Sequence, residues 1–281
     1  MNIDALVRNN VKNMSSYSSA RDDYSGGADK NLIYLDANES PFENGINRYP
    51  DNKHKNLKTV ISKNKNINVN QVVFGNGTDE ILDLIVRVFC NPNKDKIITL
   101  PPTYGMYDVI AKTNGVENIE IPLKSDFSID IERILDLKTS NIKILFLCSP
   151  NNPTGNSFEI NILDNLIKKF NGIVVVDEAY IDFSSQKSLT NLIDKYENLI
   201  ITQTMSKAYG MAGIRLGMGI SNNKIINYIN KIKPPYNVNT LTENKALKEL
   251  NKIDEIKKNI DLVLNQRMLL LTSLEKLDFV E

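Results

Sequence analysis

The sequence contains no tryptophan, one histidine and two cysteines among 281 residues. A single histidine, His54, excludes most catalytic triads and multi-histidine metal sites, because these need histidine as a base or as a repeated ligand. His54 stands in a polar stretch, and we expect it at the surface. Cys90 and Cys148 follow apolar segments and form no CxxC pair. They predict buried thiols in a reducing compartment, with neither a zinc framework nor a disulfide.

Charge of neither sign is in excess, because 34 basic residues balance 34 acidic residues. This balance gives no support for nucleic acid or an anionic membrane as a partner. The sequence also lacks an apolar run of about twenty residues, the length that crosses a bilayer. The residues that follow Met1 do not include the apolar segment of a signal peptide. We therefore expect no membrane segment and a cytoplasmic location.

Short apolar runs alternate with longer amphipathic ones along most of the chain. Several runs are continuous in Ile, Val and Leu, which is typical of strands buried on both faces. This alternation predicts an α/β fold with a mostly parallel central sheet between helices. The expected strands are Val72–Phe74, Lys96–Leu100, Ile142–Cys148, Ile173–Asp177, Leu199–Thr202 and Leu216–Ile220. The expected helices are Asp79–Phe89, Tyr104–Thr113, Ile129–Leu137, Glu159–Phe170 and Leu189–Tyr196.

The two ends of the chain differ from this alternating centre. Residues 1–40 predict a short helix, an N-terminal arm and part of a small domain, and residues 41–235 predict the large α/β domain. Residues 236–281 are expected to form helices up to Leu277 and to begin a strand at Phe279. We expect this last part to be the start of a C-terminal small domain that is incomplete, as in a fragment or a truncated form.

The stretch Thr204–Gly217, TMSKAYGMAGIRLG, contains the most informative group of residues. Lys207 stands beside the hydroxyls of Thr204 and Ser206, and Arg215 follows eight positions later. A lysine amine condenses with an aldehyde, and hydroxyls with a guanidinium can hold a phosphate. Pyridoxal 5′-phosphate (PLP) carries both groups, so the stretch predicts a PLP site. The alternative is a surface lysine, which the surrounding hydroxyls and glycines disfavour.

Two segments that follow expected strands supply further groups. In such sheets ligands bind beyond the carboxyl ends of the strands. Thr78 and Asp79 open a helix after Gly75-Asn-Gly77, where backbone N–H groups can bind a phosphate. A capped turn is an equal alternative. Tyr104, in the loop Pro101–Tyr107, can stack on a flat ring, although a core or rim tyrosine is also consistent with the pattern.

Two more segments complete the set. Asn152 lies in Ser149-Pro-Asn-Asn-Pro, where a fixed amide can donate to a phenolate-like oxygen. An ordinary Asn-Pro turn is the alternative. Asp177 ends a wholly apolar strand, where a carboxylate is costly unless it is paired, and a pyridinium nitrogen would pair with it. Tyr180 could reach the ring oxygen. A Walker B or metal carboxylate at Asp177-Glu178 is disfavoured, because no Walker A sequence accompanies it.

With these residues in this order, the chain resembles the fold-type I PLP enzymes, and more closely the histidinol-phosphate aminotransferase family, over nearly its whole length. Further matches are LDANESP at 35–41 and NRYP at 47–50. The resemblance implies that Lys207 bonds to PLP and acts as general base and acid, and that Asp177 pairs with the pyridine nitrogen. The resemblance assigns catalytic roles to Lys207, Asp177 and Tyr180.

The remaining implied roles concern the cofactor and the substrate. Asn152 and Tyr180 would bind the 3′-oxygen of PLP, and Tyr104 would stack on its ring. The implied phosphate site consists of Thr78, Asp79, Thr204, Ser206 and Arg215. Tyr49 would reach the cofactor phosphate of a neighbouring subunit, which implies a homodimer. Tyr17 and Asn38 match substrate-binding positions.

The resemblance implies transamination of L-histidinol phosphate with 2-oxoglutarate to imidazole-acetol phosphate and glutamate, a step of histidine biosynthesis. The family holds the anionic groups of its substrates with C-terminal arginines, for which we find no match. Arg267 lies in a helical pattern and is a poor substitute. A threonine-phosphate decarboxylase, an aromatic aminotransferase and a PLP-binding protein without full activity stay open as alternatives. A nucleotide-binding protein would need the GK[ST] sequence that is absent.

Overall fold

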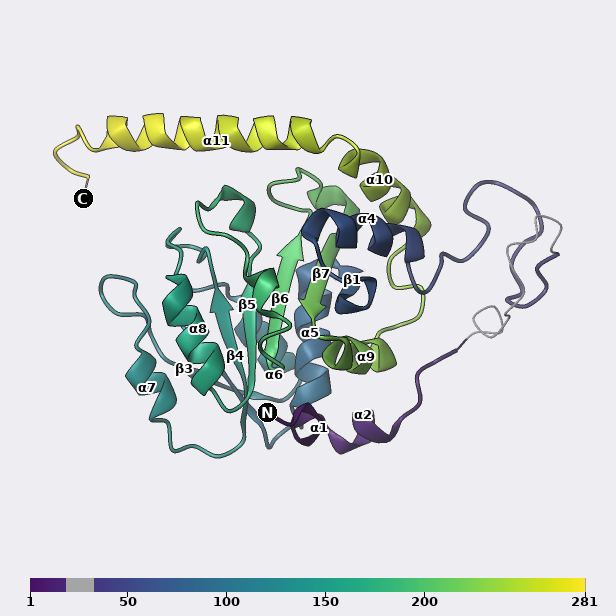
Figure 1. The fold of residues 1–281 in the computed structure, drawn as a ribbon, viewed down its shortest axis with the longest axis horizontal. Coiled ribbons are helices and arrows are strands. Elements are labelled where there is room, and N and C mark those ends of the chain that lie inside the picture. The colour runs from purple at the N-terminus through teal and green to yellow at the C-terminus, as the bar shows by residue number, and fades with distance from the viewer. Residues whose placement is uncertain (19–32, 281) are drawn as a thin grey trace.

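The computed structural model describes residues 1–18 and 33–280. Within these residues a seven-stranded sheet forms the centre of the molecule, in the order β1-β7-β6-β5-β4-β2-β3, and helices cover both of its faces (Figure 1). The strands are β1 (Val72–Asn76), β2 (Lys96–Thr99), β3 (Glu117–Glu120), β4 (Ile142–Cys148), β5 (Ile173–Asp177), β6 (Leu199–Thr204) and β7 (Leu216–Ser221). The mostly parallel α/β fold expected from the sequence is confirmed.

Helices pack on the sheet through two apolar layers. Val174 and Val176 of β5 belong to one buried cluster, which includes side chains of α8, whereas Ile173 and Val175 belong to the other, which includes side chains of α5. Burial of alternate residues on opposite faces explains the continuous apolar runs of the central strands. The helices are α1 (Ile3–Leu6), α2 (Asn9–Asn13), α4 (Lys55–Lys65), α5 (Gly77–Phe89), α6 (Met106–Thr113), α7 (Ile131–Leu135), α8 (Ile160–Lys169), α9 (Asn223–Ile232), α10 (Thr240–Leu250) and α11 (Ile253–Leu274).

The direction of β7 decides what meets at one edge of the sheet. Strands β6, β5, β4, β2 and β3 run parallel, while β7 is antiparallel to both of its neighbours, β1 and β6. The beginning of β7 therefore lies at the edge where the other strands end. Arg215, the residue before β7, consequently joins the side chains that follow β1, β4, β5 and β6.

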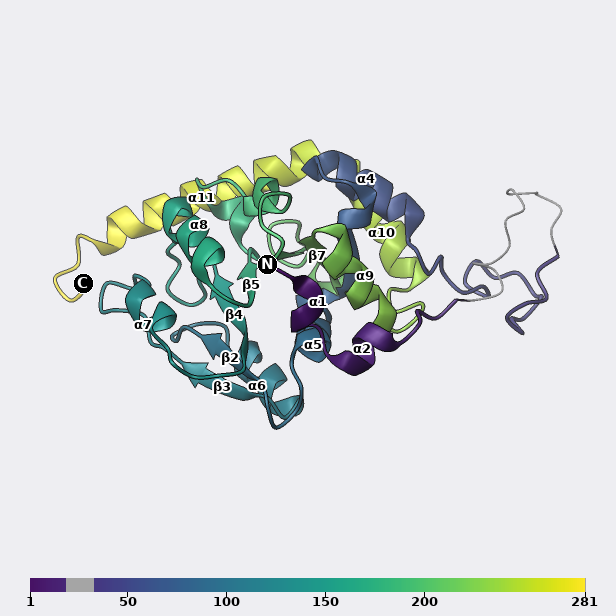
Figure 2. The same cartoon turned by 60° about the horizontal axis from the view of Figure 1, so that its bottom comes forward.

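The long helix α11 crosses this same edge. Figure 1 shows it running past the carboxyl ends of the parallel strands, and Figure 2 shows it along one side of the molecule. It packs against η2, the 3₁₀ turn Ile181–Phe183 that follows β5. In the described part of the chain, no helix combines the length and apolar character needed to cross a membrane.

Several local expectations differ from the structure. The edge strand β3 was not expected, because its sequence ENIE is polar. The helix expected at Leu189–Tyr196 is a 3₁₀ turn, Leu189–Leu192. Residues 275–280 form no strand. The buried, unpaired state of Cys90 and Cys148 is confirmed.

The surface position expected for His54 is wrong. Its side chain is only 1% exposed, because α4, which begins just after it, packs against α10. Its Nδ1 lies 3.1 Å from Oε2 of Glu243 on α10, and its ring meets Phe74 of β1 edge-on. A polar sequence around His54 did not indicate this burial, because the covering residues come from a helix about 190 positions away.

Candidate active site

Most of the predicted site residues line one cavity at the carboxyl edge of the sheet. Six segments contribute to it: those that follow β1, β2, β4, β5 and β6, and the one that precedes β7. Its predicted lining residues are Thr78, Asp79, Tyr104, Asn152, Asp177, Tyr180, Thr204, Ser206, Lys207 and Arg215. Residues far apart in the sequence thus meet because parallel strands end at a common edge.

Asp177 is a buried carboxylate held by three donors. The Tyr107 hydroxyl donates to Oδ2 at 2.8 Å, and the Thr202 hydroxyl and the Ala179 N–H donate to Oδ1 at 2.9 and 3.2 Å. Burial raises the pKa of Asp177, although these hydrogen bonds act in the opposite direction. A cation placed in the cavity would therefore favour the ionised form of Asp177 and lower its pKa.

Lys207 is exposed and faces the cavity from the turn after β6. Its Nζ lies 5.3 Å from the centre of the Tyr180 ring. The turn is fixed by the Ser206 N–H, which donates to Oγ1 of Thr204 at 3.1 Å, and by the Gly210 N–H, which donates to the Lys207 carbonyl at 3.0 Å. This places an accessible primary amine in the cavity that also contains Asp177.

The backbone of Gly77, Thr78 and Asp79 at the start of α5 forms a cradle at one end of the cavity. The Gly77 N–H donates to the Arg215 carbonyl at 2.7 Å, and Gly77 has a φ of +74°, which favours glycine. A Cβ on Gly217 would lie 2.3 Å from the Thr78 nitrogen, so only glycine permits this approach. No side chain caps α5 at Asn76. The N–H groups of Thr78 and Asp79, the next two residues of the helix, are therefore available to an anion such as a phosphate.

The side chains of Asp79, Tyr104 and Arg215 form a linked group beside this cradle. The Tyr104 hydroxyl donates to Oδ1 of Asp79 at 3.0 Å, and Nη2 of Arg215 lies 3.7 Å from Oδ2 of Asp79. Burial, together with the Asp79 charge, raises the pKa of Tyr104 to about 12. Tyr104 thus stays protonated at neutral pH, and Arg215 places a positive charge at the edge of the cavity.

The two adjacent amides after β4 have different roles. Asn151 is buried and uses its side chain internally, since it donates to the Pro102 carbonyl and to Thr154 and accepts from Thr103. Asn152 lines the cavity instead. The loop is therefore built around Asn151, while Asn152 borders the cavity.

Three predicted residues lie outside this cavity. Tyr17 is 59% exposed and lines a separate hollow with His54. Asn38 and Tyr49 line another hollow with Tyr236, on which the Tyr49 ring stacks at 4.6 Å between centroids. The substrate-binding and cofactor roles expected for these three residues stay predictions.

Two site residues were missed from the sequence. Tyr107 stands three positions after Tyr104, and its place as the second aromatic residue of the Pro101–Tyr107 motif was the signal that could have identified it. Cys148 ends β4 and lines the cavity beside Asn152. Burial raises the pKa of its thiol to about 12, so it stays uncharged.

The residues of the cavity fit PLP. A buried carboxylate with a raised pKa suits a cationic ring nitrogen, and an uncapped helix start with Arg215 suits a phosphate. An exposed amine in the same cavity suits an aldehyde. Held together, these groups can bind an aldehyde-bearing phosphate ester and move a proton beside it.

This chain is similar to known proteins in both sequence and fold. Histidinol-phosphate aminotransferase of Flavobacterium johnsoniae is 53% identical over 279 residues, which cover 99% of this chain and 80% of the relative. The structure of histidinol-phosphate aminotransferase from Clostridium acetobutylicum is 27% identical, with a TM-score of 0.75 over 83% of this chain and 70% of that one. The fold also matches the Sinorhizobium meliloti enzyme in complex with PLP, at 23% identity and a TM-score of 0.73, over 79% of this chain and 61% of that one.

The family model for aminotransferase class I and II matches residues 32–280. This range contains every segment that lines the cavity. The chain belongs to the aminotransferase class I and II family.

Proposed function

We propose that this chain is a PLP-dependent aminotransferase that converts L-histidinol phosphate and 2-oxoglutarate to imidazole-acetol phosphate and glutamate. The observation that carries the proposal is the joint presence of Lys207, Asp177 and a phosphate cradle in one cavity. The 53% identity to a histidinol-phosphate aminotransferase over nearly the whole chain supports the choice of substrate.

Each residue has a proposed role that follows from its position in the cavity. Arg215, Thr204, Ser206 and the start of α5 would hold the cofactor phosphate, and Asp177 would keep a proton on the ring nitrogen. The bound cofactor supplies an aldehyde that accepts an amino group and a ring that withdraws electrons. The Lys207 amine moves the α-proton of the amino donor as general base and acid. Asn152 and Tyr180 border the same cavity and would bind the ring oxygen.

A homodimer in the cytoplasm belongs to the same proposal. Tyr49 and Asn38 are exposed and do not line the cavity of their own chain. This position supports a role of Tyr49 toward a second copy. A complementation experiment tests it: Lys207→Ala chains mixed with Tyr49→Ala chains should regain activity, because one site of each mixed dimer receives both native residues. Absence of any regain would contradict this role.

The proposed reaction is tested with the purified chain loaded with PLP. Histidinol phosphate and 2-oxoglutarate are supplied, and glutamate and the keto product are measured by mass spectrometry. We expect one glutamate for each keto product. Release of carbon dioxide from O-phosphothreonine without glutamate would support the decarboxylase alternative instead. Bound PLP without amino transfer to any acceptor would contradict the proposed activity.

A further inference from the structure

Glu39 is a buried carboxylate in a segment of the chain that is otherwise mostly exposed. Its side chain is 3% exposed, whereas Leu35 is 85% exposed and Phe42 is 81% exposed. A carboxylate that leaves water costs free energy unless charged or hydrogen-bonding groups compensate it. Groups that compensate Glu39 come from the sequence NRYP at 47–50, which follows it along the chain.

Two adjacent residues of that sequence bind the Glu39 carboxylate. The Arg48 guanidinium donates to Oε2 at 3.0 Å, and the Tyr49 backbone N–H donates to Oε1 at 2.6 Å. The Asn47 amide donates to the Ser40 carbonyl at 3.0 Å and joins the same two segments a second time. These five residues form a clasp, which explains why the sequences LDANESP and NRYP occur together.

The ring of Tyr49 is supported separately from its backbone. It stacks on the ring of Tyr236 at 4.6 Å between centroids, with 20° between the ring planes. The next residue, Asn237, donates from its amide to the Phe74 carbonyl and to Oε2 of Glu80, each at 3.0 Å. The clasp thus holds the backbone of Tyr49 and the large domain supports its ring, while the side chain is 52% exposed.

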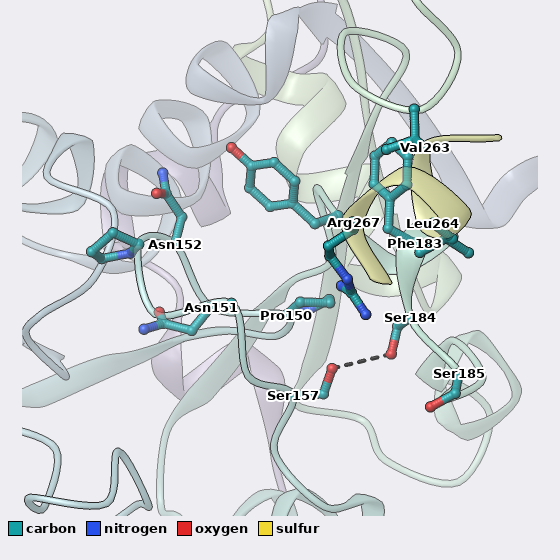
Figure 3. A pocket seen from close by; sticks show the side chains of 13 residues that line it. Pro150, Asn151, Asn152, Ser157, Phe183, Ser184, Ser185, Val263, Leu264 and Arg267 are labelled. Atoms are coloured by element: carbon teal, nitrogen blue, oxygen red, sulfur yellow. Dashed lines mark hydrogen bonds between the residues drawn. The ribbon is translucent and has the colours of Figure 1, made fainter. Parts of the chain in front are cut away.

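The clasp lies apart from the cavity that contains Lys207. Neither Glu39 nor Tyr49 is among the described residues that line this cavity. They are also absent from the described lining of the adjoining hollow beneath α11, which shares Asn152 and Tyr180 with the cavity (Figure 3). A side chain that is held firmly and exposed away from its own cavity is suited to a neighbouring molecule.

We infer that Glu39 is a positioning residue, which holds Tyr49 toward the cofactor phosphate of a second copy of this chain. This inference rests on the proposed function, in which Tyr49 reaches that phosphate, and it adds the residue that keeps Tyr49 in place. A hydroxyl must lie within about 3 Å of a phosphate oxygen to bind it. Without the carboxylate, the Tyr49 backbone gains freedom that binding must then remove, at a cost in conformational entropy.

The first test is a double-mutant cycle on the affinity for PLP, measured from the absorbance of the bound cofactor. We expect the dissociation constant to rise about tenfold in Tyr49→Phe, in Glu39→Ala and in the double variant, because all three lose the same contact. Glu43→Ala, which removes an exposed carboxylate of the same segment, is the control and should bind PLP as wild type does. A rise of about 100-fold in the double variant, or no change in Glu39→Ala, would overturn the positioning role.

A conservative variant separates positioning from a loss of folding. Glu39→Gln keeps an oxygen that accepts from the Tyr49 N–H but loses the charge that pairs with Arg48. Its PLP affinity should therefore lie between those of wild type and Glu39→Ala. An affinity of Glu39→Gln equal to that of Glu39→Ala would contradict a role of the Tyr49 hydrogen bond.

Mixed dimers show which of the two cavities depends on Glu39. Activity is measured at a PLP concentration that saturates wild type but not Glu39→Ala. Glu39→Ala chains mixed with Lys207→Ala chains should regain activity, because the native clasp of the second chain serves the cavity of the first. Glu39→Ala chains mixed with Tyr49→Ala chains should regain none, because both changes damage the same clasp. The reverse pattern would show that Glu39 acts on its own cavity and would overturn the inference.

The same measurements distinguish this inference from the proposed function. If Tyr49→Phe binds PLP as wild type does, the proposed role of Tyr49 fails and the role of Glu39 fails with it. If Tyr49→Phe binds PLP weakly and Glu39→Ala does not, only the inference fails. If both variants bind PLP weakly but wild type does not transaminate histidinol phosphate, the proposed reaction fails while the role of Glu39 stands.

Discussion

The Tyr107 hydroxyl donates a 2.8 Å hydrogen bond to Oδ2 of Asp177, and both side chains are buried. Burial and the neighbouring Asp177 charge raise the pKa of Tyr107 well above its ordinary value. Tyr107 therefore stays protonated, and a hydrogen-bond donor, at neutral pH. Its hydrogen bond favours the ionised carboxylate, against the effect of burial, and so prepares Asp177 to meet a cationic ring nitrogen.

Removing this hydrogen bond should move the pH profile. In Tyr107→Phe the carboxylate of Asp177 loses one stabilising donor, so its pKa rises further. Because the proposed mechanism needs ionised Asp177, the acidic limb of kcat/KM should shift to higher pH. The measurement is kcat/KM for histidinol phosphate as a function of pH. A profile that falls in height without moving along the pH axis would indicate that Tyr107 is only structural.

Neutralising Asp177 should separate stability from activity. Asp177→Asn preserves the shape of the side chain, and we expect turnover to fall about 100-fold or more with loss of the electrostatic partner.

In the cofactor-free protein the raised pKa of Asp177 contributes stability at pH values below 3.8, the ordinary pKa of an aspartate. This contribution is lost as the pH rises. The free energy of unfolding of Asp177→Asn, relative to wild type, should therefore increase between pH 4 and pH 7. Urea unfolding at these pH values would contradict the argument if the difference stayed constant.

Lys207→Ala should abolish turnover without affecting the fold. The side chain is exposed, so its removal should leave the core unchanged, while loss of the base costs on the order of 10²–10⁴-fold in rate or more. Borohydride reduction followed by peptide mass spectrometry should attach the cofactor to Lys207 in wild type, and to no residue in the variant. Near-normal turnover in Lys207→Ala would remove the basis of the proposed mechanism.

Two glycines in the same segment provide a matched pair. In Gly217→Ala the new Cβ would lie 2.3 Å from the Thr78 nitrogen, so the start of α5 must move away from β7. We expect a loss of about 1–3 kcal/mol of stability, typical of overpacking, together with weaker PLP binding. Gly213→Ala meets no atom within 4 Å and should behave as wild type. Equal melting temperatures and equal PLP affinities of the two variants would contradict the close approach.

The buried contact between His54 and Glu243 should contribute to stability. His54→Asn keeps a residue that tolerates the left-handed backbone at φ +49° but withdraws the ring from Glu243. We expect a destabilisation of about 1–3 kcal/mol, because the buried Glu243 carboxyl loses a hydrogen-bond partner. Asn56→Ala, an exposed change on the same helix, is the control. Full additivity of His54→Asn and Glu243→Gln in urea unfolding would indicate that the two side chains act independently.

The alternation of apolar and amphipathic runs was enough to predict the fold class, and the motifs that follow the strands predicted most of the residues that line the cavity. Asp177 and Lys207 follow strands whose apolar character reports burial on both faces, and parallel strands end at one edge. Local pattern therefore located these residues without any knowledge of distant contacts. The edge strand β3 escaped prediction because its residues are not buried, and burial is the source of the apolar signal.

The sequence by itself determined most of the segments that become strands and helices, and which chemical groups follow them, because hydrophobic periodicity and short motifs are local. Only the tertiary structure decided the contacts made by residues far apart in the chain. The antiparallel direction of β7 brings Arg215 to the cavity, α10 buries His54, and α11 packs against the turn that follows β5. Each of these placements depends on packing between separate elements, which no local pattern of residues records.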